Sequence, residues 1–388
     1  MKKFLIIGIV SLFILTLFPI KTRAETIDET LILNISSPSV ALIDYSSGKT
    51  LYAKEANKRM YPASMTKMMS MYLLLECIKN KTNTFEEIVT VSEFAASMGG
   101  SQIFLKENEK MSFEDLFTAI AVASANDAVV ALAEHTYGSV ELFIDKMNKT
   151  AKEFNMNDTH FVNTTGFHDE NHYTTVNDMG ILARKLLLEH KDNLLKYTSI
   201  YETYLRKDTD NPFWLVTTNK LLNTYEGMDG LKTGYTSESG YNLTATAKRD
   251  NLRFIAIVMG GSSSKSRNAD ITTLLNYGFN KYKSVTLYKN GETLKEVTFS
   301  NAKYSSSQII TNEDINIVIE KNQNLDNVNI NIEIFKNVAP ISKEDIIGKL
   351  KIKGQDGTLI ADYNLYVKED VPKLSFWDHF LHFFKKII

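Results

Sequence analysis

The sequence predicts an α/β domain followed by a small all-β domain. Strand patterns occur near both ends of the first 284 residues, and mainly helical patterns lie between them. This order indicates one domain whose sheet is assembled from segments far apart in the chain. Residues 285–370 instead alternate short apolar runs with Asn-Gly and Asp-Gly turns, which is typical of β-hairpins.

The N-terminus has the pattern of a secretory signal. Lys2 and Lys3 precede an apolar run over residues 4–20, and small residues stand at the −3 and −1 positions of a cleavage site after Ala24. A retained anchor helix is the alternative. Cleavage removes four basic residues, so the net charge changes from −2 to −6. Neither charge favours a nucleic-acid partner, and we expect an exported protein.

The elements of the α/β domain follow from local patterns. Residues 40–45 and 50–54 flank a Ser-Ser-Gly turn and predict a hairpin. Ser112 and Asp115 predict a capping box before FEDLFTAIAVA. The single cysteine, Cys77, excludes an internal disulfide and is expected in the core. Later strands and a closing helix are predicted at residues 230–235, 241–247, 252–259 and 268–283.

Residues 371–388 predict an amphipathic helix. Large apolar side chains share one helical face, and His and charged side chains share the other. The segment is too short and too charged to span a bilayer. We therefore expect it to lie in a membrane surface as an anchor. A helix packed on the all-β domain is the alternative.

Ser64 and Lys67 stand at the head of a Met-rich run. S-x-x-K occurs four times in the chain, but only this copy opens an expected amphipathic helix, where both side chains share one face. A serine is a poor nucleophile until an adjacent base takes its proton. Lysine can be that base only when neutral, so burial or a second cation must lower the pKa of Lys67.

Two further motifs fit this chemistry. Ser124-Ala125-Asn126 interrupts two apolar helical runs, where a hydroxyl and an amide are otherwise unfavourable. Lys232-Thr233-Gly234 begins a strand expected at the sheet edge. A cation and a hydroxyl there could bind a carboxylate, and glycine allows a substrate backbone to approach closely. The sequence therefore predicts nucleophilic catalysis on a substrate that carries a carboxylate.

In this order, S-x-x-K, S-x-N and K-T-G resemble the active-site signature of penicillin-binding proteins and serine β-lactamases. The whole chain resembles a low-molecular-weight penicillin-binding protein of the serine D-Ala-D-Ala carboxypeptidase family. The resemblance implies a catalytic domain with an antiparallel sheet flanked by a helical cluster, then a small β-sandwich-like domain. The implied parts are a signal peptide, a catalytic domain, a β domain and an anchoring helix, over residues 1–24, 25–284, 285–370 and 371–388.

The resemblance also implies catalytic roles. Ser64 would be the acylated nucleophile and Lys67 its general base. Ser124 would relay a proton to the leaving amine, and Asn126 would hold a substrate amide. The backbone N–H groups of Ser64 and Tyr235 would form the oxyanion hole.

A second set of residues is implied in substrate binding. Lys232 and Thr233 would bind the terminal carboxylate and keep Lys67 neutral, and Gly234 would give the substrate room. Arg267 matches the family's arginine before the last catalytic-domain helix, where it would also receive that carboxylate. The implied substrate is a peptidoglycan stem peptide ending in D-Ala-D-Ala, bound along the Lys232 strand at the outer face of the cytoplasmic membrane or in the cell wall.

The implied enzyme needs no metal or cofactor, and β-lactams would acylate its serine. The alternatives are a DD-transpeptidase or endopeptidase and a non-catalytic penicillin-binding wall sensor. Efficient β-lactamase activity is not expected, because Ala125 replaces the Asp of S-D-N. Glu189 is only a loose match to the deacylating glutamate and is expected at a helix end. His168 and His172 are expected in a loop, not in a zinc site.

Overall fold

The computed structural model describes residues 33–375, apart from 305, 326–327, 355–356 and 358. The predicted signal peptide and residues 376–388 of the predicted anchor helix lie outside the described residues. The predicted start of that helix was wrong, because residues 371–375 are not helical: Val371 bridges to Ile341, and Lys373 bridges to Ala302. Within the described part of the chain, we find no helix with the length and apolar character needed to cross a bilayer.

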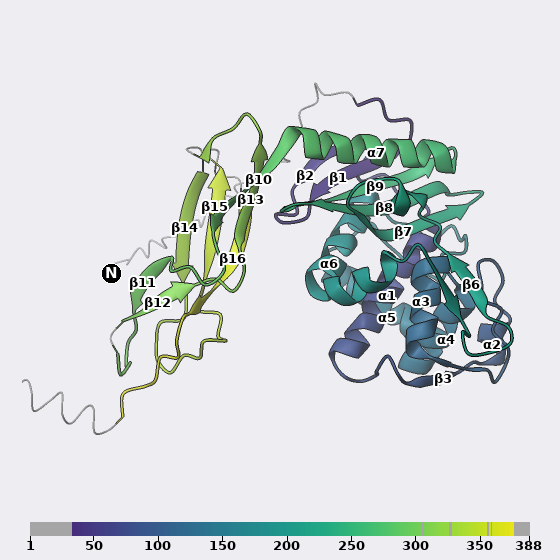
Figure 1. Ribbon diagram of the computed structural model, residues 1–388, viewed down its shortest axis with the longest axis horizontal. Helices are drawn as coiled ribbons and strands as arrows, with labels where there is room; N and C mark the ends of the chain where they lie inside the picture. Colours follow the sequence, from purple (N-terminus) through teal and green to yellow (C-terminus); the bar gives the residue numbers. More distant parts are fainter. Residues whose placement is uncertain (1–32, 305, 326–327, 355–356, 358, 376–388) are drawn as a thin grey trace, which may run out of the picture. The chain divides into compact units, whose positions relative to one another are not determined.

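The α/β domain is built on a five-stranded antiparallel sheet with the strand order β2-β1-β9-β8-β7 (Figure 1). The N-terminal strand β1 pairs with β9, so distant segments meet in one sheet, as predicted. The strand that carries Lys232 is β7, and it lies at the sheet edge, also as predicted. The strands are β1 (Ser39–Asp44), β2 (Thr50–Lys54), β7 (Met228–Thr236), β8 (Gly240–Arg249) and β9 (Leu252–Gly261).

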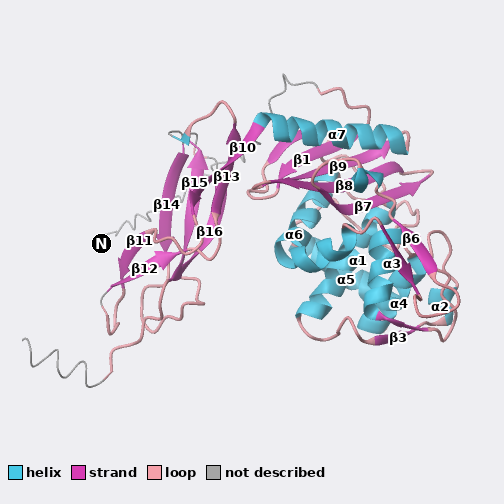
Figure 2. Ribbon diagram, in the orientation of Figure 1, coloured by secondary structure: helices cyan, strands magenta, loops and turns pink. Residues whose placement is uncertain are grey.

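Helices cover both faces of this sheet (Figure 2). Each face of the sheet packs on its own core, as strand β1 shows, because its side chains alternate between the two cores. Ala41 and Ile43 join the core under the helical cluster, and Val40 and Leu42 join the core under α7 (Ser264–Lys281). The cluster contains α1 (Lys67–Lys79), α3 (Phe113–Ala123), α4 (Asn126–Tyr137), α5 (Val140–Glu153) and α6 (Val176–Thr198).

The helix after Ser64 is not amphipathic, and this prediction was wrong. Ser64 lies in a 3-10 turn, η1 (Ala63–Thr66), and α1 begins at Lys67. Residues 67–75 are all buried, because α1 runs through the middle of the cluster and contacts α3, α4, α5 and α6. A helix that is buried all round carries apolar residues on every face, which explains the Met-rich run. Cys77 is buried near its end, as predicted.

Three other helix boundaries show how local bonds decide the ends. Ser112 caps α3 by accepting a hydrogen bond from the Asp115 N–H, which is one of the two hydrogen bonds of the predicted capping box. Helix α7 begins four residues earlier than predicted, because Ser263 and Ser266 form a reciprocal capping box. Helix α6 does not end near Glu189, but continues to Thr198 through a kink.

Smaller elements surround the cluster. They form two short antiparallel strand pairs, one short helix and a second 3-10 turn. These are β3 (Ile88–Thr90) with β4 (Lys110–Ser112), β5 (Glu202–Leu205) with β6 (Phe213–Val216), α2 (Glu93–Ala96) and η2 (Lys220–Asn223).

The following strands form the predicted all-β domain, which we call the β domain. A five-stranded antiparallel sheet has the order β11-β12-β16-β15-β14, and β10 pairs with β13. Its core is separate, with Ile315, Ile317 and Ile319 alternating inward along β13. The strands are β10 (Tyr282–Tyr288), β11 (Lys295–Thr298), β12 (Ser306–Ile310), β13 (Ile315–Glu320), β14 (Val328–Ile334), β15 (Gly348–Gly354) and β16 (Leu359–Val367).

Candidate active site

Ser64 and Lys67 are in direct contact at the start of α1. The Lys67 Nζ lies 3.1 Å from the Ser64 Oγ, and it donates to the Asn126 Oδ1 and the Thr165 carbonyl oxygen at 2.7 Å each. A neutral amine has two hydrogens and one lone pair. The two carbonyl-type acceptors use both hydrogens, so the lone pair is left for the serine hydroxyl. This geometry lets Lys67 take the Ser64 proton.

The surroundings favour the neutral form of Lys67. Its side chain is completely buried, with an exposed fraction of 0%. Burial lowers the pKa of Lys67 well below its usual value, Lys232 lowers it further, and Asp127 opposes the shift. Both causes that the sequence analysis required, burial and a second cation, are therefore present.

The loop that supplies the Thr165 carbonyl packs directly against the Ser64 turn. Gly166 adopts a φ of +89°, and a Cβ there would lie 1.9 Å from the Ala63 carbonyl oxygen. Only glycine fits this close approach. The sequence analysis missed Thr165, since it acts through its backbone. The signal that could have found this loop is the Asn-Thr-Thr-Gly run, in which the Asn163 Oδ1 accepts from the N–H groups of Thr165 and Gly166.

Ser124 and Asn126 lie where α3 meets α4. Ser124 ends α3 in the left-handed conformation, with a φ of +64°. Its buried hydroxyl has no hydrogen-bond partner among the described residues. Asn126 opens α4, and its Nδ2 donates to the Gly99 carbonyl at 2.8 Å while its Oδ1 accepts from Lys67. Asn126 therefore orients the Lys67 amine, a contact that the sequence analysis did not anticipate.

Strand β7 forms the opposite wall. Lys232 is 1% exposed, and its Nζ donates to the Thr233 carbonyl at 3.1 Å. Burial, with help from Arg267, lowers the pKa of Lys232 to about 7. The Thr233 Oγ1 lies 2.5 Å from the Thr218 Oγ1. A Cβ at Gly234 would lie 2.6 Å from the Pro62 carbonyl oxygen, so glycine brings the strand close to the Ser64 turn.

Arg267 adds a further buried cation. It lies in the first turn of α7, not before that helix as the resemblance suggested, because α7 starts early at Ser264. Its guanidinium donates to the Asn268 Oδ1 at 2.8 Å and to the Asn242 carbonyl at 3.4 Å. Burial lowers the pKa of Arg267 to about 10, so it remains charged at neutral pH.

These cations have no acidic partners in the described part of the chain. Neither Lys67, Lys232 nor Arg267 forms an ion pair there. Buried charges are normally paired, because leaving water is costly. The unpaired, buried guanidinium of Arg267, next to Lys232, therefore suits an anionic ligand.

A pocket of about 290 Å³ opens between these elements. Its lining also includes four residues that the sequence analysis missed, Ser101, Thr218, Tyr241 and Ser264. The Tyr241 ring lies against the Tyr235 ring, with centroids 4.3 Å apart. The predicted residues in the lining are Ser64, Ser124, Thr233, Gly234, Tyr235 and Arg267. Lys67, Lys232 and Asn126 lie buried next to them, so the structure brings all of the predicted site residues together.

Comparison with known proteins identifies the family. The family described as D-alanyl-D-alanine carboxypeptidase matches residues 23–263, and the C-terminal domain of penicillin-binding protein 5 matches residues 282–373. The D-alanyl-D-alanine carboxypeptidase DacF of Bacillus subtilis is 41% identical over 377 residues, covering 97% of this chain and 96% of the relative. The chain belongs to the D-alanyl-D-alanine carboxypeptidase family.

Solved structures of relatives agree with this membership. Penicillin-binding protein 5 from Haemophilus influenzae superimposes with a TM-score of 0.72 at 32% identity, over 88% of this chain and 99% of that one. Penicillin-binding protein D2 from Listeria monocytogenes, in its ampicillin-bound form, gives 0.58 at 31% identity, over 64% and 100%. The fold class and the family resemblance stated from the sequence are thus confirmed.

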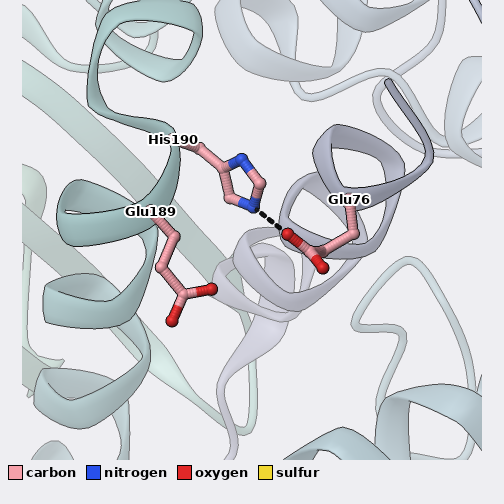
Figure 3. A group of neighbouring side chains, drawn as sticks. All are labelled: Glu76, Glu189 and His190. Carbon is pink, nitrogen blue, oxygen red and sulfur yellow. Dashed lines mark ion pairs between the residues drawn. The ribbon is translucent and has the colours of Figure 1, made fainter. Parts of the chain in front are cut away.

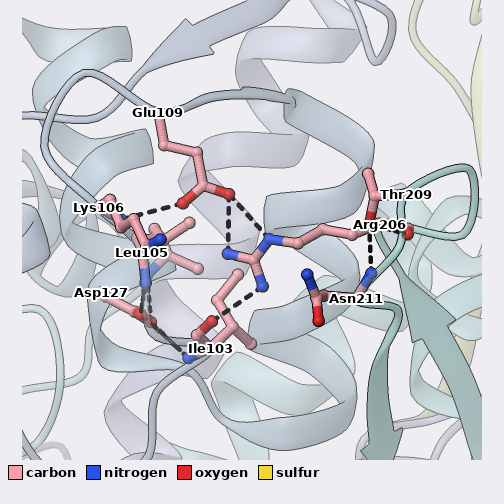
Figure 4. A network of polar contacts seen from close by, with 9 residues as sticks. Ile103, Leu105, Lys106, Glu109, Asp127, Arg206, Thr209 and Asn211 are labelled. Carbon is pink, nitrogen blue, oxygen red and sulfur yellow. Dashed lines mark hydrogen bonds and ion pairs between the residues drawn. The ribbon is translucent and has the colours of Figure 1, made fainter.

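In this family member, the start of α4 is held by a buried network that the sequence analysis missed (Figure 4). The Asp127 carboxylate accepts from the N–H groups of Ile103 at 3.0 Å and Leu105 at 3.1 Å. Arg206 donates to the Ile103 carbonyl at 3.1 Å and to the Glu109 Oε1 at 2.8 Å. The network fixes the loop beside Asn126. The sequence feature that could have revealed this network is Asp127, an acidic residue directly after S-x-N in an apolar helix.

The His168–His172 segment is a loop, as predicted. His172 is buried, its Nδ1 accepts from the Val162 N–H at 3.2 Å, and its Nε2 lies 2.7 Å from the Thr66 Oγ1. Burial lowers the pKa of His172 to about 4, so the ring is neutral and its Nε2–H donates to Thr66. His172 thereby ties this loop to η1, next to Ser64.

Proposed function

We propose that the chain is a serine-type D-alanyl-D-alanine carboxypeptidase that removes the terminal D-Ala from peptidoglycan stem peptides. The observation that carries this proposal is the Ser64 hydroxyl beside the buried amine of Lys67. Both stand at a pocket that also contains the unpaired cation of Arg267. Membership of the family supports the same substrate class.

In the proposed acylation, the Lys67 Nζ takes the Ser64 proton as the Oγ bonds to the carbonyl carbon of the scissile amide. The backbone N–H groups of Ser64 and Tyr235 would bind the oxyanion. The close approach at Gly234 supports this pairing, since a Cβ there would lie 3.1 Å from the Ser64 nitrogen. The carbon–nitrogen bond then breaks and leaves an ester on Ser64.

The leaving amine needs a proton, and Ser124 is placed to deliver it. Its buried hydroxyl lines the pocket and lacks a partner among the described residues. The Lys67 proton would pass through this hydroxyl to the amine, and D-Ala would leave. A water then attacks the ester while Lys67 accepts a water proton. Returning that proton to the Ser64 oxygen releases the shortened peptide.

The terminal carboxylate of the substrate would bind at the Thr233 hydroxyl and the Arg267 guanidinium. Arginine forms two parallel hydrogen bonds to a carboxylate. Arg267 is charged at neutral pH and has no acidic partner in the described chain. Binding there would add the extended peptide to the free edge of β7. β-Lactams would use the same contacts and acylate Ser64.

Release of D-Ala tests the proposal. The purified chain, incubated with a peptide ending in D-Ala-D-Ala, should release free D-Ala, and Ser64→Ala should release none. Mass mapping after labelled penicillin should find the label on Ser64. A folded chain that releases no D-Ala rejects the carboxypeptidase. Transfer of the acyl group to an added amine would favour a transpeptidase, and label without turnover would favour a wall sensor.

We also propose the organisation that the sequence implied. Residues 1–24 would be a cleaved signal, and residues 376–388 of the predicted anchor would hold the enzyme on the outer face of the cytoplasmic membrane, where stem peptides occur. The catalytic and β domains would occupy residues 25–284 and 285–370. Deleting residues 376–388 should release the protein from membranes and leave activity on soluble peptides intact, because this deletion keeps Val371 in the core of the β domain. A truncated form that stays on membranes contradicts the anchor.

A further inference from the structure

Three side chains of metal-binding type meet between α1 and α6, outside the active site. Glu76 comes from the last turns of α1, and Glu189 and His190 come from α6 (Figure 3). One ligand atom from each residue lies within 4.8 Å of the other two. The proposed reaction uses none of these residues.

The backbone conformation and the side-chain contacts of His190 are unusual. It is 5% exposed, and its Nε2 contacts the Glu76 Oε1 at 3.0 Å as an ion pair, without the geometry of a hydrogen bond. Helix α6 leaves helical geometry at this residue, with a φ of −136° and a ψ of 19°. Successive residues of a regular helix point about 100° apart. The kink instead lets Glu189 and His190 both face α1.

A buried imidazole nitrogen that faces carboxylates without forming a well-directed hydrogen bond is costly, and a bound ion is one physical explanation for it. We propose that Glu76, Glu189 and His190 bind Zn²⁺, with a water as the fourth ligand of a tetrahedral site. The imidazole nitrogen favours Zn²⁺ over Ca²⁺ or Mg²⁺, which prefer oxygen ligands. The ion would fix the end of α1 to the kink of α6.

The neighbouring side chain of Tyr72 supports this assignment. Its hydroxyl donates to the Glu189 Oε2 at 2.7 Å, and its ring packs on the His190 ring with centroids 5.2 Å apart. Such contacts orient metal ligands in known sites.

In the structure, two lysines contact the carboxylates of Glu76 and Glu189. The Lys79 Nζ lies 3.1 Å from Glu76, and the Lys185 Nζ lies 3.3 Å from Glu189. Their side chains are 51% and 41% exposed, so both can turn into solvent when a metal arrives. A cavity of about 350 Å³ is lined by Tyr72 and Glu76, one member of the cluster.

Zinc titration of the full mature chain, without a histidine tag, tests the site. Calorimetry with ZnSO₄ should show one site that is lost in His190→Gln, and the melting temperature should rise with Zn²⁺ in the wild type. Glu189→Gln, a milder change at the surface, should weaken binding about tenfold or more. Lys79→Met should tighten binding, because it removes a competing cation.

The matched control is His135→Gln. The His135 Nε2 lies 2.9 Å from the Glu87 Oε1, so this residue is another His–Glu pair, but it belongs to no three-ligand cluster among the described residues. It should bind Zn²⁺ like the wild type. Penicillin labelling of Ser64 reports correct folding of each variant. Absence of zinc binding by the wild type, or equal loss in His135→Gln and Glu189→Gln, overturns the proposal.

Discussion

Basic side chains serve opposite purposes in the α/β domain and the β domain. Lys67, Lys232 and Arg267 are buried and form no ion pair in the described chain. In the β domain, the Lys349 Nζ instead lies 2.6 Å from the Asp362 Oδ2, and both side chains are more than 40% exposed. The active-site pocket therefore buries three basic groups at a cost in free energy, whereas the pair in the β domain remains in water beside an acid.

The difference shows that the protein accepts a lower stability at the active site, where the reaction needs buried basic groups. A buried amine without an acidic partner costs free energy, and the protein reduces the cost by keeping the amine neutral. An exposed pair contributes only about 0–1 kcal/mol and has no consequence for a reaction. Changes to the buried cations should therefore alter activity, and changes to the exposed pairs should alter stability slightly.

The largest effect is expected for Lys67→Met, which removes the base but keeps the shape of the side chain. The rate of Ser64 labelling by penicillin should fall about 10³-fold or more, because the serine loses its proton acceptor. The melting temperature should fall modestly, because the Asn126 Oδ1 and the Thr165 carbonyl lose their buried hydrogen-bond donor. Lys351→Met, an exposed lysine of the β domain, is the control and should label normally. Near-normal labelling of Lys67→Met would remove Lys67 from the mechanism.

The next effect is expected for Ser124→Ala. The rate constant for D-Ala release should fall about 10²-fold, because the leaving amine loses its proton donor. Thr150→Val is the matched control, since the Thr150 Oγ1 is also a buried hydroxyl without a partner, but it lies outside the active-site pocket. Both changes remove an unsatisfied hydroxyl, and both should leave stability equal or higher. Equal kinetic losses in the two variants would show that Ser124 acts only through packing.

Much of the fold could be predicted because its signals are local. Alternating strands, a capping serine and turn residues predicted the sheet, the edge position of the Lys232 strand and the all-β domain. The burial of α1 could not be predicted, since it depends on four helices that pack around it. The polar side chains of Ser64 and Lys67 at the start of α1 suggested that this helix has a polar face. In the structure they instead lie at the active-site pocket.

The residues of the active site also divide into those that could be predicted from the sequence and those that could not. Residues that act through side chains in motifs, such as Ser64 and Lys232, could be found from the sequence. The Thr165 carbonyl could not, because every residue carries one and only the fold decides where it points. Asn242 was missed for a similar reason: its amide joins the Pro62 carbonyl to the Gly260 N–H, across three distant segments.

A smaller effect, on pH dependence, is expected for Lys232→Met. Removing this neighbouring positive charge favours the charged form of Lys67 and raises its pKa. We would measure the rate of penicillin labelling from pH 5 to pH 10. The acidic limb of this pH–rate profile should therefore lie at higher pH than in the wild type. A limb that moves to lower pH would contradict the electrostatic role of Lys232.

The same variant should change how stability depends on pH. The pKa of Lys232 is about 7 in the folded chain and 10.5 in its ordinary state. Between these values the unfolded chain binds a proton that the folded chain does not, so wild-type stability should rise with pH. Denaturant titrations should show a weaker rise over this window in Lys232→Met. An unchanged slope would indicate that Lys232 stays charged in the folded chain.

The smallest effect is expected for Glu333→Gln in the β domain. It breaks the 2.6 Å pair with the Lys351 Nζ, in which the two side chains are 44% and 32% exposed. The free energy of unfolding should fall by less than about 1 kcal/mol, and by still less in high salt, because water and ions already screen the pair. Denaturant titration at low and high salt measures this, and D-Ala release should be unchanged. A loss of several kcal/mol, or any loss of activity, would show that the β domain also depends on its charges in the way the active site does.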